Sequence, residues 1–126
     1  MNQIRTHRDL LIWQKSMILV TEIYRKSQRF PTQEQYGLTS QIRRAAVSIP
    51  SNIAEGFGRQ STGDYIRFLN IAVGSLFEVQ TQIEIAFNLS FITESDFTVI
   101  FENTREIDRM ISSLIQKLKI KKDEGK

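Results

Sequence analysis

Four long segments of this chain repeat apolar residues at alternating steps of three and four positions, and this period decides the fold class. Such spacing lines apolar side chains along one stripe of an α-helix. The four stripes consist of Leu10, Trp13, Met17, Val20 and Tyr24; Leu38, Ile42, Ala45, Ile49 and Ile53; Tyr65, Leu69, Ala72, Leu76, Val79, Ile83 and Ala86; and Phe97, Ile100, Ile107, Ile111, Leu114 and Leu118, interrupted by Thr104. Long helices with short connections pack as an antiparallel up-and-down four-helix bundle with coiled-coil-like crossings. We therefore predict an all-α fold of this kind.

The 126 residues suffice for one hydrophobic core, so we predict a single domain over residues 1–126. The predicted helices span about 9–28, 34–57, 62–89 and 94–120, and residues 121–126 are expected to form a frayed tail.

Local signals support these boundaries. The run Thr32–Gln35 predicts a capping box for the second helix, while Ser61 and Thr93 predict caps for the third and fourth. Gly56 and Gly58 are expected to stop the second helix.

Residues 41–59 carry an unusual helix with Pro50 in its interior. An interior proline removes a backbone N–H and costs a helix about 3 kcal/mol, so we predict a kink at Pro50. The small residues of this segment, together with Gly74 and Ser75, predict a close approach of the second and third helices.

The chain lacks the residues of a catalytic or metal site. It has no cysteine and one histidine, His7, so we expect no disulfide, metal or cofactor. Ser48 and Ser51 have no neighbouring base, and the glycine-rich run 56–63 lacks the Gly-Lys-Ser/Thr core of a phosphate loop. We predict a non-enzyme with no small-molecule substrate.

Charge is unevenly distributed along the chain. Residues 1–67 carry 10 Lys or Arg against 5 Asp or Glu, whereas residues 68–116 carry 2 against 7. A basic half favours a polyanionic partner or pairing with an acidic surface. The candidates for phosphate contacts are Arg43, Arg44, Arg59 and Arg67. Alternatively, these arginines form salt bridges with Glu55, Glu78 or Glu84.

Surplus apolar residues outside the four stripes predict a homo-oligomer, because large exposed apolar patches mark partner surfaces. They are Ile12, Ile18, Leu19 and Ile23 in the first helix and Phe68, Ile71, Val73, Phe77, Ile85 and Phe87 in the third. No apolar run approaches the ~18 residues of a membrane span, and the N-terminus lacks the pattern of a signal peptide. We expect a cytoplasmic protein without a membrane partner.

The runs LTSQIRRAAVSIPSNIAEGFGR (38–59) and DYIRFLNIAVGSLFEVQTQIEIA (64–86), with DLLIWQKS (9–16), resemble the 23S ribosomal RNA intervening-sequence protein family. The resemblance implies an antiparallel four-helix bundle that assembles into a ring-like homopentamer. It also implies a fold similar to accessory variability determinant proteins, basic pentamers that bind nucleic acid and a reverse transcriptase. The resemblance supplies no catalytic residues. The matched motif positions are Arg43, Arg44, Ser48, Pro50, Asn52, Glu55, Gly56, Arg59 and Glu78.

One departure is Val79-Gln80, where the family pattern more usually has Leu-Glu. We therefore expect a non-enzymatic homo-oligomeric bundle that binds ribosomal RNA or its intervening-sequence stem. The alternative is a protein-interaction scaffold whose arginines form inter-helix or inter-subunit salt bridges, with no nucleic-acid role.

Overall fold

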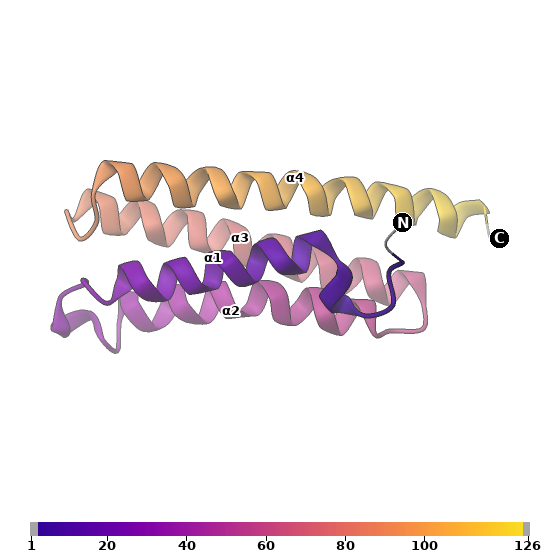
Figure 1. Cartoon of the computed structure of the whole chain (residues 1–126), viewed down its shortest axis with the longest axis horizontal. Coiled ribbons are helices and arrows are strands. Elements are labelled where there is room, and N and C mark those ends of the chain that lie inside the picture. Colours follow the sequence, from indigo (N-terminus) through magenta and orange to yellow (C-terminus); the bar gives the residue numbers. More distant parts are fainter. Residues whose placement is uncertain (1–2, 125–126) are drawn as a thin grey trace.

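The computed structural model describes residues 3–124, and all regular structure in this range is helical. The four long helices are α1 (Leu11–Ser27), α2 (Leu38–Phe57), α3 (Thr62–Asn88) and α4 (Glu94–Glu124), and two short 3-10 turns, η1 (His7–Asp9) and η2 (Thr32–Glu34), precede α1 and α2. The helices run side by side with alternating direction (Figure 1), which confirms the predicted antiparallel bundle. The start of α1 and the end of α4 lie at the end of the bundle that holds the α2–α3 turn.

The stripes predicted for α2, α3 and α4 form the hydrophobic core. Every stripe residue of α2 is buried, and so are the stripe residues of α3 between positions 69 and 86. In α4, Ile100, Ile107 and Ile111 are buried, while Phe97, Leu114 and Leu118 are partly buried against the core. Thr104 is buried as well. Its hydroxyl donates to the Phe101 carbonyl and accepts from Nε2 of Gln80, at 2.6 and 3.0 Å, so this polar entry in the stripe is satisfied.

The stripe predicted for α1 is only partly correct, because Leu10, Trp13 and Val20 pack against the core but do not form its most buried side. The buried side of α1 carries Ile12, Leu19 and Ile23, whereas Met17 and Tyr24 of the predicted stripe are each 41% exposed. Ser16 interrupts the true stripe, and it is fully buried because its hydroxyl donates to the Ile12 carbonyl at 2.6 Å. Because Ser16 finds an acceptor within its own helix, it can be buried, and the apolar period alone did not identify this face of α1 as the core side.

The start of α2 also differs from the prediction. Residues 32–34 form η2 rather than a capping box, and α2 begins four residues later than expected, at Leu38. The first N–H of α2 donates instead to Oε1 of Glu34, at 3.1 Å. The caps predicted for α3 and α4 are confirmed, because Ser61 and Thr93 each accept the backbone N–H three residues ahead, at 3.1 Å.

The C-terminal end of α2 lies where predicted, whereas α4 is longer than predicted. Gly58 follows the last residue of α2, and its N–H donates to the Ala54 carbonyl, whereas Gly56 lies inside the helix. Helix α4 continues to Glu124, so residues 121–124 of the expected frayed tail are helical; residues 125–126 lie outside the described range.

Pro50 is buried within α2, and the helix continues on both sides of it. The bend that we predict at Pro50 stays a prediction. The side-chain donor near this position is Asn52, whose Nδ2 contacts the Ser48 carbonyl at 2.8 Å. Asn52 therefore does not serve the Ala46 carbonyl, which the proline leaves without its usual N–H donor.

Helices α2 and α3 meet most closely at Gly56. A Cβ atom added there would lie 2.9 Å from Cβ of Phe68 and 3.2 Å from the Tyr65 carbonyl oxygen. Gly74 was predicted to share this role, but it is exposed and a Cβ added to it would meet nothing within 4 Å. Ser75 instead faces α2 and donates to Oγ of Ser48 at 2.8 Å.

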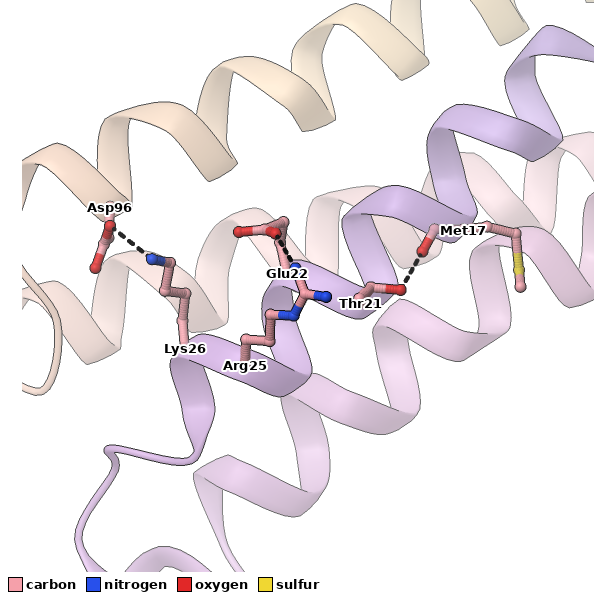
Figure 2. A network of polar contacts seen from close by, with 6 residues as sticks. All are labelled: Met17, Thr21, Glu22, Arg25, Lys26 and Asp96. Atoms are coloured by element: carbon pink, nitrogen blue, oxygen red, sulfur yellow. Dashed lines mark hydrogen bonds and ion pairs between the residues drawn. The ribbon is translucent and has the colours of Figure 1, made fainter.

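Ion pairs join α1 to α4 along their seam. Figure 2 shows Lys26 at the end of α1 reaching Asp96 in the first turn of α4, at 3.2 Å. Lys15 pairs with Glu106 at 3.0 Å. Among residues 3–124, no helix is both long and apolar enough to cross a membrane.

Candidate nucleic-acid interface

Arg43 is occupied in holding α1 against α2. Its Nε donates to Oγ of Ser27 at 2.8 Å and its Nη2 donates to the Tyr24 carbonyl at 3.2 Å. The guanidinium also lies 4.7 Å from the centre of the Tyr24 ring. The last carbonyls of a helix have no partner within the helix, so Arg43 acts as a side-chain cap for α1. These contacts use two of its five N–H donors and hold the guanidinium in the seam between α1 and α2.

Arg44 points away from Arg43, as expected for neighbours about 100° apart on a helix. It is exposed and lines a groove between α2 and α3 together with Glu78 and Gln82. Within residues 3–124, Arg44 takes part in no ion pair. The structure therefore separates the two adjacent arginines into a structural and an available one.

Arg59 and Arg67 both stack on the ring of Phe68, and we call these three residues the Arg–Phe cluster. Their guanidinium carbons lie 4.8 and 4.7 Å from the ring centre. Each arginine also pairs with a carboxylate of its own neighbourhood, Arg59 with Glu55 and Arg67 with Asp64. The Arg59–Glu55 pair joins residues four apart in one chain, so it is not an inter-helix or inter-subunit bridge of the kind predicted; it is exposed and contributes little to stability.

The lysine-rich end of α4 approaches the Arg–Phe cluster. Lys119, Lys122 and the acidic Asp123 of α4 line a shallow hollow of about 270 Å³ with Gly63 and Ile66, in the first turns of α3. Nζ of Lys122 lies 3.4 Å from the position of a Cβ on Gly63. Arg67 follows Ile66 directly, so cations from α3 and α4 converge at this end of the bundle, which we call the basic end (Figure 1).

The N-terminal turn docks at the same end, on Trp13. The rings of His7 and Trp13 lie 5.1 Å apart in an edge-to-face arrangement, and the Arg8 guanidinium carbon lies 5.6 Å from the Trp13 ring. Sequence reasoning missed this arm and the Arg–Phe cluster, because each joins residues of different elements.

The remaining motif positions serve packing and a polar network. Ser48 accepts from Ser75 and from Asn52, the latter at 2.9 Å. Gly56 allows the close approach of α3, and burial raises the pKa of Tyr65 beside it. In the described range, no three His, Asp or Glu side chains gather as a metal site would require.

The four predicted arginines therefore form no single patch. Arg43 belongs to the α1–α2 seam, Arg44 to the groove between α2 and α3, and Arg59 and Arg67 to the basic end. About 15 helical residues separate Arg44 from Arg59, or roughly 20 Å.

Comparisons with known proteins agree with this architecture. The family model described as "23S rRNA-intervening sequence protein" matches residues 8–113. A crystal structure of a protein of unknown function from the S23 ribosomal protein family of Bacteroides thetaiotaomicron has 28% sequence identity, with a TM-score of 0.76. The match covers 83% of this chain and 98% of that chain. No curated protein matches. Because the family match spans most of the chain, the protein belongs to the family of 23S rRNA-intervening sequence proteins.

Proposed function

We propose that this protein is a non-enzymatic, cytoplasmic, homo-oligomeric bundle that binds structured RNA through its basic end. The observation that carries this proposal is that the Arg–Phe cluster and the hollow lined by Lys119 and Lys122 lie at the same end of the bundle. Arginine contacts phosphates through several donors, and its stacking on Phe68 orients the guanidinium without consuming those donors.

The family name supports ribosomal RNA or its intervening-sequence stem as the target. The carboxylates of Glu55 and Asp64 do not block this role, because exposed ion pairs exchange readily for phosphate contacts.

The test is RNA binding by fluorescence anisotropy with a structured ribosomal RNA stem at low and moderate salt. Affinity should fall steeply with salt, because each phosphate contact releases counterions. The double variant Arg59→Gln/Arg67→Gln should weaken binding and reduce the slope of log affinity against log salt by roughly one for each lost contact. Arg105→Gln is the matched control, since Arg105 is also exposed and pairs with a carboxylate one turn away, Glu102. Absence of binding at low salt, or equal effects of the variant and control, would contradict the function.

Self-association is the second part of the function that we propose. Ile71, Phe77 and Ile85 are 43%, 52% and 41% exposed on the outward side of α3, and exposed apolar side chains are candidates for a partner surface. A groove of about 340 Å³ between α1 and α2, lined by Trp13, Met17, Val20, Val47, Pro50, Ser51 and Ala54, offers an apolar counterpart. The family resemblance favours five copies in a ring.

The alternative function, a protein-interaction scaffold, is favoured by Arg44, which has no carboxylate partner in the described part of its own chain. If Arg44 pairs with a carboxylate of another copy, Arg44→Glu dissociates the oligomer in size-exclusion chromatography. If the RNA function holds, the oligomer survives this substitution.

A further inference from the structure

The groove between α2 and α3, which we call the α2–α3 groove, is a polar hollow separate from the basic end. Its volume is about 580 Å³, and its walls include Tyr36, Arg44, Ser48, Glu78 and Gln82. Neither Arg59 nor Arg67 takes part in it.

Three groups in the α2–α3 groove have polar capacity that the described residues leave unused. Arg44 and Glu78 take part in no ion pair within residues 3–124. Oε1 of Gln82 is buried and has no hydrogen-bond partner in the same range. A buried amide oxygen without a donor is unfavourable, and the terminal torsion of glutamine turns easily. When this torsion turns Oε1 toward the groove, an N–H group of a ligand bound there can donate a hydrogen bond to it.

Ser48 adds a donor to the groove. Its Oγ accepts from Oγ of Ser75 at 2.8 Å and from Nδ2 of Asn52 at 2.9 Å. A hydroxyl has two acceptor sites and one donor, so both acceptor sites are occupied and the proton of Ser48 is left for an acceptor.

The opposite charges of Arg44 and Glu78 define what fits. A simple anion gains from Arg44 but is repelled by Glu78, so the matching ligand carries an anionic group and separate N–H donors. Tyr36 stands at the edge of the groove with 91% of its surface exposed. An exposed aromatic face is a stacking platform for a flat ring.

We propose that the α2–α3 groove binds a nucleotide. The phosphate contacts Arg44, the base stacks on Tyr36, and an amino group of the base donates to Glu78 and to Gln82. Where the nucleotide is part of RNA, this inference rests on the proposed RNA function; a free nucleotide meets the same chemistry. Glutamate and glutamine oxygens accept hydrogen bonds from base amino groups. An exocyclic amino group offers two N–H donors, one for Glu78 and one for Gln82, whereas uracil offers a single ring N–H, so the groove favours adenine, cytosine and guanine over uracil.

The test is titration calorimetry with AMP, CMP, GMP and UMP, repeated with short single-stranded homopolymers of A, C and U. The amino-bearing nucleotides should bind about 10-fold tighter than UMP. Gln82→Met keeps the side-chain length but removes the amide, and should reduce this preference. Arg44→Gln should weaken all four nucleotides, and Tyr36→Ala should weaken them by about 10-fold.

Gln80→Met is the matched control on the same helix, because Gln80 faces α4 and donates to Thr104. It should leave nucleotide affinity unchanged, and thermal melting checks that each variant is folded. Equal affinity for UMP and the other nucleotides, or the same effect from Gln80→Met as from Gln82→Met, would overturn the proposal.

The two functions fail separately. Arg59→Gln/Arg67→Gln should abolish the basic-end contribution to RNA binding and leave mononucleotide binding intact. If RNA binding depends on Arg59 and Arg67 but no mononucleotide binds, the proposal for the α2–α3 groove is wrong and the RNA function of the basic end is retained. Dissociation of the oligomer by Arg44→Glu would show that a neighbouring copy occupies the groove, which also overturns it.

Discussion

At the scale of single residues, the two glycines of the α2–α3 pair have opposite roles. Gly56 is buried where α2 and α3 touch, with no space for a methyl group, whereas Gly74 is on the open side of α3. The Phe68 atoms nearest to Gly56 lie at the root of a side chain, which cannot turn away without moving α3. Size at position 56 is therefore limited by the distance between two helix backbones.

This contrast predicts opposite effects of the same substitution. Gly56→Ala should lower the free energy of unfolding by about 1–3 kcal/mol, because the methyl group overpacks the contact with Tyr65 and Phe68. Gly74→Ala should raise it by about 0.5–1 kcal/mol, because alanine loses less backbone entropy in a helix interior. Urea denaturation of the two variants measures both. Equal stability changes of the same sign would show that the close approach at Gly56 does not limit packing.

The directions of the arginine side chains could be predicted from the sequence, but not all of their partners. The angle between neighbours on a helix predicted that Arg43 and Arg44 diverge, and the structure confirms it. The contacts of Arg43 with Ser27 and Tyr24, and of Arg59 with Phe68, could not be predicted, because these partners come from other elements. Phe68 in particular was expected on an apolar surface, and it instead carries two guanidinium groups.

At the scale of elements, the buried face of a helix could be predicted where its stripe is purely apolar. Helices α2 and α3 have stripes without a charged residue, so period alone identified their buried faces. In α1, Ser16 and Ser27 stand on the buried face, and the more continuous apolar stripe on the adjacent face was preferred. The end of α3 was predicted to within one residue, although the turn after it contains no glycine. Ser90, at a φ of 64°, takes the left-handed position that glycine usually occupies.

The N-terminal turn η1 depends on one carboxylate. The backbone N–H groups of Arg5 and Thr6 donate to Oδ2 of Asp9 at 2.9 and 3.0 Å, and these bonds lower the pKa of Asp9. A lowered pKa means that the ionised carboxylate favours the docked turn at neutral pH, and that this contribution is lost as the pH falls through the lowered value.

We therefore expect the amide NMR signals of Arg5 and Thr6 to titrate together, with a midpoint below the ordinary range of an aspartate. In Asp9→Asn, which cannot ionise, these signals should show no such transition. A midpoint at or above the usual aspartate value would contradict the role of the two hydrogen bonds.

At the scale of the whole molecule, the charged surface and the exposed apolar surface lie in different places. The basic end gathers cations from α3 and α4, while the outward side of α3 exposes Ile71, Phe77 and Ile85 along its length. Copies that associate through α3 would place their basic ends around a common rim, which raises the local charge that an RNA meets.

Self-association through α3 predicts a specific loss. Phe77→Asp should reduce the assembly to smaller species in analytical ultracentrifugation, because a carboxylate cannot be buried unpaired in an apolar contact. Helical circular dichroism should persist, since Phe77 is 52% exposed within the chain. Val99→Asp is the control, on α4 and 54% exposed. An unchanged assembly in Phe77→Asp would exclude this side of α3 as the contact.

The docking of the N-terminal turn has a practical consequence. Trp13 is the single tryptophan of the chain, and the His7 ring and the Arg8 guanidinium both contact it. Indole emission is sensitive to nearby cations and to stacked or edge-on aromatic rings. The native protein therefore carries its own optical reporter at the basic end, and detachment of the turn can be followed by fluorescence without any attached label.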